Sequence, residues 1–124
     1  MGATQLVIHE PTQHSFRQVT LTKIDIATSG DNTIITPSSS AELRILFLSF
    51  VCNAAVNIIL NEGTVAEGQA ALTGVMNMLA NGSITWDFPS VAYALPFARN
   101  KSFVINLSAA KQVSGLMMSY EVQG

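Results

Sequence analysis

The sequence predicts an all-β protein, an antiparallel β-sandwich or jelly roll of about eight to nine strands. Short apolar stretches with strand-like alternation recur at intervals of about ten residues, and clusters of Gly, Pro, Asn and Ser separate them. The 124 residues of the chain also suit a single domain. We place this domain at residues 16–124, after an extended N-terminal arm at residues 1–15.

Each expected strand is an apolar or alternating segment that ends at a turn signal. The most distinct signals are Ser29-Gly30-Asp31-Asn32 and Asn81-Gly82, and Asn-Gly is the pair that two-residue hairpin turns favour. Pro37, Pro89 and Pro96 mark further breaks. The strands are expected at residues 16–28, 33–36, 43–52, 56–60, 71–80, 83–88, 102–108 and 112–122, with a short edge-like stretch at 91–95.

Residues 65–80 fit both a helix and a strand, because their apolar positions satisfy either period. Gly68 and Gly74 would each cost a helix interior about 1 kcal/mol. The neighbouring segments are also β-rich. We therefore predict a strand at 71–80 and a hairpin turn at Asn81-Gly82, with a helix as the alternative.

Residues 43–60 form the longest apolar run, and the strand at its start is apolar on both faces. Period two separates its large side chains into two sets, Leu43, Ile45, Phe47 and Val51 on one face and Leu46, Leu48 and Phe50 on the other. A sandwich strand normally presents one polar face to water. Both faces of this strand need cover, so we predict a homo-oligomer, with a homotrimer as the expected form. Leu46, Leu48 and Phe50 are the residues expected to contact another subunit.

The composition argues against several classes of partner. Charged residues make up only 11% of the chain, against about 25% in an average soluble domain, so exposed apolar patches are expected. The net charge is −2 and the basic residues are dispersed, so we expect no nucleic-acid partner. Asn53 and Asn57 interrupt the apolar run, and its β-branched and aromatic content suits strands, so we expect no membrane span.

No motif supplies catalytic or metal chemistry. His9 and His14 are five residues apart, so a strand would place them on opposite faces, which is poor geometry for one metal ion. The segment 63–68 has the first spacing of a phosphate-binding loop, but Gln69 stands where that motif requires Lys. Cys52 is the only cysteine and is expected to be a buried small hydrophobe. We expect no enzymatic activity, no cofactor and no metal.

Aromatic residues offer a second class of function. Trp86, Tyr93 and Phe97 lie around a loop bounded by prolines, and carbohydrate-binding sandwiches stack sugars on such rings. A Trp on a strand more commonly packs in a core or an interface. We therefore keep carbohydrate binding as an alternative to an assembly role.

Four segments between residues 42 and 122 carry a family pattern. They are Glu42–Phe50, Ala71–Leu79 followed by Asn81-Gly82, Lys101–Ser108 and Val113–Glu121. These segments resemble small β-sandwich virion proteins of tailed bacteriophages. Members of that group commonly end in a strand with Val, Gly and Tyr, matched here by Val113, Gly115 and Tyr120.

The resemblance implies an accessory capsid protein of the decoration or cement type, commonly trimeric, which binds the major capsid protein at the outer surface of the virion. The N-terminal arm would hold the shell or a neighbouring subunit by adding a strand to an open sheet edge, with Leu6 and Ile8 as its anchors. The alternatives are a carbohydrate-binding module on a virion or fibre, which would use Trp86, Tyr93 and Phe97, and a neck or tail adaptor.

Overall fold

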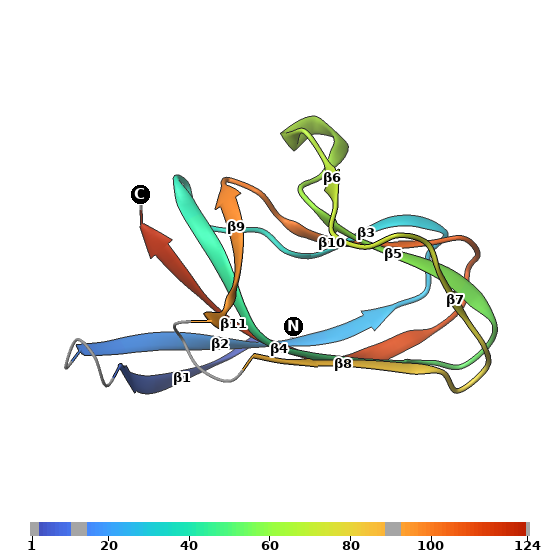
Figure 1. Cartoon of the computed structure of the whole chain (residues 1–124), viewed down its shortest axis with the longest axis horizontal. Coiled ribbons are helices and arrows are strands. Elements are labelled where there is room, and N and C mark those ends of the chain that lie inside the picture. Colours follow the sequence, from blue (N-terminus) through green and yellow to red (C-terminus); the bar gives the residue numbers. More distant parts are fainter. Residues whose placement is uncertain (1–2, 11–14, 89–92, 124) are drawn as a thin grey trace.

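The computed structural model describes the backbone of residues 3–10, 15–88 and 93–123, and the side chains of these residues from Gln18 onward. The described residues form two antiparallel sheets, one of six strands and one of five, which are the two layers of a sandwich (Figure 1). This confirms the predicted fold class. One 3-10 turn, η1 (Val65–Glu67), precedes β6, and no helix in the described part of the chain is long and apolar enough to cross a bilayer.

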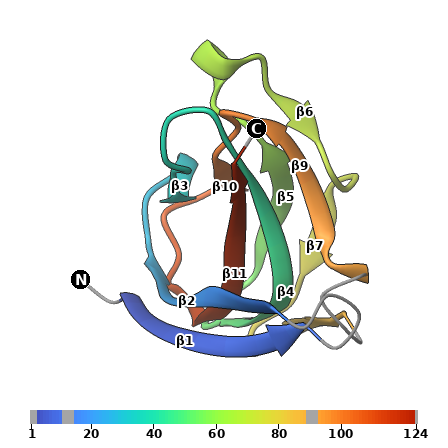
Figure 2. The same ribbon diagram turned by 90° about the vertical axis from the view of Figure 1, so that its left-hand side faces the viewer.

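The six-stranded sheet is built around two long central strands, β4 (Ala41–Cys52) and β11 (Val113–Gln123), which pair antiparallel along their lengths (Figure 2). The order in this sheet is β1-β2-β11-β4-β8, and β9 also pairs with β4. The other members are β1 (Ala3–Glu10), β2 (Ser15–Ile26), β8 (Ser83–Asp87) and β9 (Leu95–Arg99).

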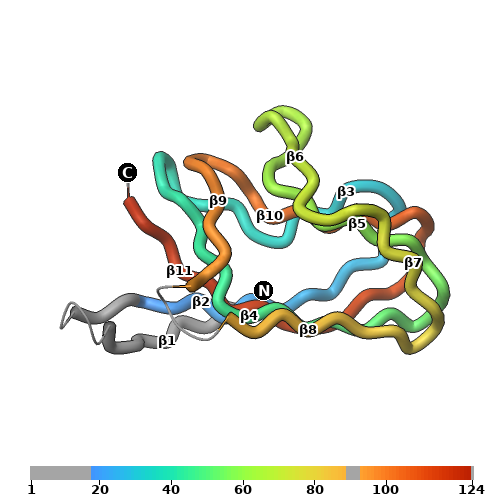
Figure 3. Tube along the Cα trace, in the orientation of Figure 1, coloured from blue at the N-terminus to red at the C-terminus, as the bar shows by residue number. Residues whose placement is uncertain are grey.

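The five-stranded sheet has the order β3-β10-β5-β6, and β7 also pairs with β5. Its members are β3 (Gly30–Ile35), β5 (Val56–Glu62), β6 (Ala70–Ala71), β7 (Met76–Met78) and β10 (Phe103–Leu107). The chain crosses repeatedly from one sheet to the other, as the tube in Figure 3 shows. Each sheet therefore contains strands that are distant in sequence.

The main core lies between the two sheets and takes side chains from both. Its buried members are Ile24, Leu43, Ile45, Leu48, Phe50, Cys52, Val56, Ile58, Leu60, Phe97, Phe103, Ile105, Leu107, Val113 and Met117. The rings of Phe97 and Phe103 meet edge to face, with their centres 6.0 Å apart. Cys52 is a free, buried cysteine, and burial raises the pKa of its thiol, so it behaves as a small hydrophobe. A smaller second cluster contains Val19, Leu46 and Tyr120.

The segment predicted as one strand at 71–80 is divided between β6 and β7. A turn does follow it at Asn81-Gly82, where the Gly82 N–H donates to the Leu79 carbonyl at 2.8 Å and Asn81 has a φ of 65°. The predicted hairpin across this turn is wrong, because β7 pairs with β5 in one sheet and β8 pairs with β4 in the other. The turn carries the chain between the sheets.

Strand β4 does not keep strict alternation along its length. Opposite it on β11, Met118 pairs with Phe47 and Ser119 pairs with Ile45, so Leu46 is an extra residue at a register shift. Such a shift is a β-bulge, and it changes which alternate positions face a given side of the sheet.

The bulge explains why β4 looked apolar on both faces. Leu43 before the bulge and Leu48 and Phe50 after it all belong to the main core, with exposed fractions of 0%, 0% and 2%. Phe47 is half-buried and Val51 is 42% exposed. Most of the large apolar side chains on this strand are covered by the chain itself.

The segment expected to be an N-terminal arm contains β1, which pairs antiparallel with β2 over all eight residues from Ala3 to Glu10. Among the described strands, β1 pairs with β2 alone. It is the outermost strand on this side of the six-stranded sheet.

Candidate interaction surface

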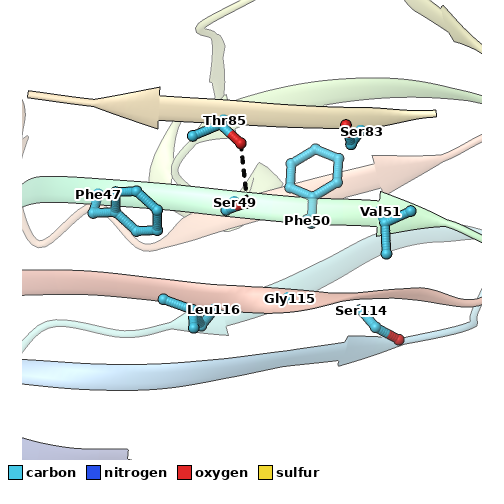
Figure 4. A pocket seen from close by; sticks show the side chains of 9 residues that line it. All are labelled: Phe47, Ser49, Phe50, Val51, Ser83, Thr85, Ser114, Gly115 and Leu116. Atoms are coloured by element: carbon cyan, nitrogen blue, oxygen red, sulfur yellow. Dashed lines mark hydrogen bonds between the residues drawn. The ribbon is translucent and has the colours of Figure 1, made fainter. Parts of the chain in front are cut away.

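A shallow groove of about 380 Å³ crosses the outer face of the six-stranded sheet. Three neighbouring strands, β8, β4 and β11, form it (Figure 4). Its lining residues are Phe47, Ser49, Phe50, Val51, Ser83, Thr85, Ser114, Gly115 and Leu116. None of them is charged. We call this surface the outer groove.

The register of the three strands aligns the groove side chains in rows across the sheet. The two rows are Thr85-Ser49-Leu116 and Ser83-Val51-Ser114. Within the first row, the hydroxyls of Ser49 and Thr85 are 3.1 Å apart and hydrogen-bonded (Figure 4). These residues face outward because they alternate with core residues, such as Val113 and Met117 on β11.

At Gly115, β11 lies too close to β4 for a side chain to fit between the two strands. A Cβ atom added there would overlap the carbonyl oxygen of Ser49 and would lie 2.6 Å from the Cα atom of Phe50. Gly115 is not among the glycines with positive φ, so its backbone conformation is open to other residues. The requirement for glycine is therefore one of space between the two central strands.

The outer groove combines exposed apolar side chains with uncharged polar ones, and charged residues lie at its edge. Val51 is 42% exposed and Leu116 is 40% exposed. On the adjoining strand β2, Lys23 pairs in register with Leu116, and its ammonium lies 3.9 Å from the carboxylate of Asp25. On the other side, Asp87 pairs in register with Phe47. Exposed apolar side chains surrounded by polar and charged residues are the usual composition of a protein–protein interface.

Three residues that the sequence assigned to an interaction surface are inside the sandwich. Leu48, Phe50 and Phe97 belong to the main core and are at most 2% exposed. Although Phe50 also lines the outer groove, these three side chains offer almost no surface to a partner in this conformation. Leu46 is 8% exposed and packs in the second cluster with Val19. The apolar residues that line the groove on these strands, Phe47 and Val51 on β4 and Leu116 on β11, were not predicted as interaction residues.

The three aromatic residues considered for sugar stacking do not form one platform. Phe97 is buried against Phe103, whereas Tyr93 is 69% exposed. Trp86 is half-buried against the main core and meets Phe88 edge to face at 6.3 Å. A shallow depression of about 440 Å³ remains beside it, lined by Thr85, Trp86, Asp87, Phe88 and Leu95.

Leu6 and Ile8 are the predicted anchors of the arm. The structure describes the backbone pairing of these two residues. Leu6 pairs in register with Val19, and Ile8 pairs with Arg17. The side chains of Leu6 and Ile8 lie outside the described residues. Their proposed role as anchors stays a prediction.

The loop before β6 is fixed by the carboxylate of Glu67. This group accepts hydrogen bonds from the backbone N–H groups of Thr64 (2.9 Å) and Ser102 (2.8 Å) and from the Ser102 hydroxyl (3.0 Å). The Lys101 ammonium donates to the Glu67 carbonyl. Burial by itself raises the pKa of Glu67, but these donors and the Lys101 charge outweigh it and hold the pKa below its ordinary value. The hydrogen bonds of this carboxylate therefore connect the loop to Ser102, the residue before β10.

Among the residues whose side chains the structure describes, no three His, Cys, Asp or Glu side chains are grouped as metal ligands. His9 and His14 lie outside that set.

Comparison of the sequence with protein-family models and with curated proteins gives no match.

Proposed function

We propose that this chain is a structural virion protein that decorates and stabilises the capsid of a tailed bacteriophage. The resemblance of residues 42–122 to small β-sandwich virion proteins supports the class of function. The outer groove is the observation that carries the proposal at the level of residues. In this role the protein binds the major capsid protein at the outer surface of the shell and acts without a cofactor.

The outer groove supports a role in assembly because it interrupts the polar face that a sandwich normally turns to water. Val51 and Leu116 stay substantially exposed within it. The surface is also rigid, because it is built on β4 and β11, whose inward side chains fill the main core. A rigid, uncharged surface with charges only at its edge binds another protein at a small cost in side-chain ordering.

A protein of this kind stabilises a shell by binding the assembled state in preference to the free subunits. Each bound copy buries apolar surface across a joint between capsomers, and its binding free energy adds to the stability of the joint. This mechanism requires a contact surface and no reactive group. The surface residues that would make the contact are Phe47, Val51 and Leu116.

The variant Leu116→Glu should weaken binding to the shell by about tenfold or more, because the contact would have to remove a carboxylate from water. Its cross-strand neighbour Lys23 already has Asp25 as a partner at 3.9 Å, so it compensates only part of this cost. The measurement is co-sedimentation of the purified protein with shells of the virus that encodes it, over a range of protein concentrations. The thermal unfolding midpoint of the free variant should change little, since Leu116 already faces water.

Leu79→Glu is the matched control for this experiment. Leu79 is 77% exposed and follows β7, which belongs to the other sheet, so the same chemical change occurs away from the outer groove. We expect this variant to bind shells as the natural chain does. Equal binding by the natural chain and Leu116→Glu would contradict the assignment of the outer groove as the contact surface.

A further inference from the structure

We propose that Asn81 is a site of spontaneous covalent modification, at which the backbone nitrogen of Gly82 displaces the side-chain amide and ammonia is lost. The folded turn suppresses this reaction, and local opening of the turn permits it. The inference does not depend on a role in the virion. It rests on the only Asn-Gly pair of the sequence and on the hydrogen bonds that hold this pair in the fold.

The reaction needs an asparagine side chain and an unhindered backbone nitrogen on the following residue. Glycine supplies such a nitrogen because it has no side chain. Once it has lost its proton, the Gly82 nitrogen attacks the carbonyl carbon of the Asn81 side chain. A C–N bond forms to this carbon, its bond to the side-chain nitrogen breaks, and ammonia leaves with the proton. Water then opens the resulting cyclic imide at either carbonyl, which gives aspartate or isoaspartate.

The turn at residues 79–82 itself requires these two amino acids. Asn81 has a φ of 65°, a left-handed conformation that asparagine adopts more readily than most residues with a side chain. A Cβ atom added at Gly82 would lie 2.9 Å from the carbonyl oxygen of Leu79, so a glycine is needed there as well. The geometry of the turn therefore places the two reacting residues side by side.

Three backbone hydrogen bonds hold the reacting peptide group in the folded chain. The Gly82 N–H, which must lose its proton, donates to the Leu79 carbonyl at 2.8 Å. The Asn81 N–H donates to the Cys52 carbonyl at 2.8 Å, and the Gly82 carbonyl accepts from the Cys52 N–H at 2.9 Å. Attack requires the nitrogen to be released from this arrangement. Asn81 is exposed, and exposed turns open locally without unfolding of the core.

Formation of isoaspartate would change the structure at the end of β4. The main chain then runs through the former side chain and is longer by one carbon atom. The two hydrogen bonds to Cys52 cannot both keep their geometry, and Cys52 is fully buried, so its backbone groups would lose partners at a cost. The next residue, Ser83, lies opposite Val51 in the outer groove (Figure 4). The modification would therefore loosen this end of the groove.

Asn100 provides an internal comparison in the same chain. It is exposed, has a φ of 62°, and donates its N–H to the carbonyl of Ala41 at 2.9 Å. The residue after it is Lys101, whose side chain shields the backbone nitrogen from attack. The Asn100 side chain also accepts a hydrogen bond from the Ser40 N–H at 2.7 Å, a difference that disappears when the chain is unfolded.

The test follows the natural full-length chain during incubation at mildly alkaline pH, both folded and in a concentration of urea that unfolds it. Peptide mapping by mass spectrometry detects the small mass increase when a carboxyl group replaces an amide, and chromatography separates aspartate from isoaspartate. We expect conversion at Asn81 in both conditions and little at Asn100 in either. Conversion of Asn81 should be slower in the folded chain by about tenfold to a hundredfold, because opening the turn breaks three hydrogen bonds. Hydrogen exchange of the Gly82 amide measures this opening independently.

The variant Asn81→Asp separates the two effects of the modification. It carries the charge of the product on a backbone of normal length, and aspartate tolerates the left-handed conformation. We expect its unfolding midpoint in urea to stay close to that of the natural chain. The isoaspartate form, purified from aged protein, should unfold at a lower concentration of urea. Equal midpoints for these two forms would contradict the described hydrogen bonds to Cys52.

Three outcomes would overturn the proposal. Asn81 that is unchanged in the unfolded chain, or is converted no faster than Asn100 there, would show that the pair is not reactive. Equal rates in the folded and unfolded chain would show that the hydrogen bonds of the turn do not control the reaction. A folded chain that stays unmodified while the Gly82 amide exchanges would show that opening does not expose the nitrogen to attack.

Discussion

Replacing Gly115 by alanine should destabilise the fold by about 3 kcal/mol, the upper part of the range for overpacking. The added Cβ atom would overlap the carbonyl oxygen of Ser49. That oxygen belongs to the backbone of β4, so it cannot move aside as the end of a flexible side chain could. The two central strands, β4 and β11, would have to separate at this point. Chemical denaturation of the purified variant, followed by circular dichroism, measures the change in the free energy of unfolding.

Gly74→Ala is the control for the general effect of removing a glycine. No heavy atom lies within 4 Å of a Cβ built at Gly74, and its φ is outside the left-handed region. This substitution should be neutral or should stabilise the protein by up to about 1 kcal/mol, because it restricts the unfolded chain. A Gly115→Ala variant as stable as Gly74→Ala would show that β4 and β11 do not approach as described.

The variant Phe50→Ala should cost about 3–5 kcal/mol of stability, as is typical for removing a buried phenylalanine ring. Phe50 is 2% exposed and lies in the main core, although the sequence assigned it to a contact with another subunit. The measurement is thermal or chemical unfolding at a protein concentration low enough to keep the chain dissociated. Under this condition the loss of a contact between subunits would leave the stability unchanged.

Val51→Ala provides the comparison on the same strand. Val51 is the next residue along β4, is 42% exposed and lines the outer groove, so its truncation should cost less than about 1 kcal/mol. The large difference between neighbouring positions tests the bulge at Leu46, which determines the side of the sheet that each residue faces. Equal costs at Phe50 and Val51 would contradict the described register of β4.

The strands of this protein could be predicted from the sequence because their signals are local. Alternation of apolar residues defined the strands around Phe103 and Val113, and Asn81-Gly82 marked a real turn. The partner of each strand was harder to predict. The conformation of a turn depends on its own few residues, whereas the sheet in which the next strand pairs depends on the packing of the whole domain. This is why the turn at Asn81 was found and its hairpin was not.

The outer groove could not be predicted because it follows from a bulge. Alternation assigns the face of each residue only while the register is regular, and one extra residue reverses every later assignment. The extra residue, Leu46, is defined by its position opposite Met118 and Ser119, about seventy residues later in the chain. Regular alternation therefore assigned Phe50 to the face that contacts a partner and Val51 to the opposite face. In the structure Phe50 is in the core and Val51 faces outward. The large number of apolar residues on β4 did indicate that both of its faces are covered. Most of these residues are covered by the core of the same chain.

A reconstruction of the native particle by cryo-electron microscopy, compared with a particle that lacks this chain, tests the central claim most directly. The proposed function predicts density for the sandwich on the outside of the shell at three-fold or quasi-three-fold positions, with the outer groove turned towards the capsomers. The particle that lacks the chain should disassemble at a lower temperature. Density in a five-, six- or twelve-fold ring at the neck or tail, or no density for the chain on the shell, would contradict a role in capsid decoration.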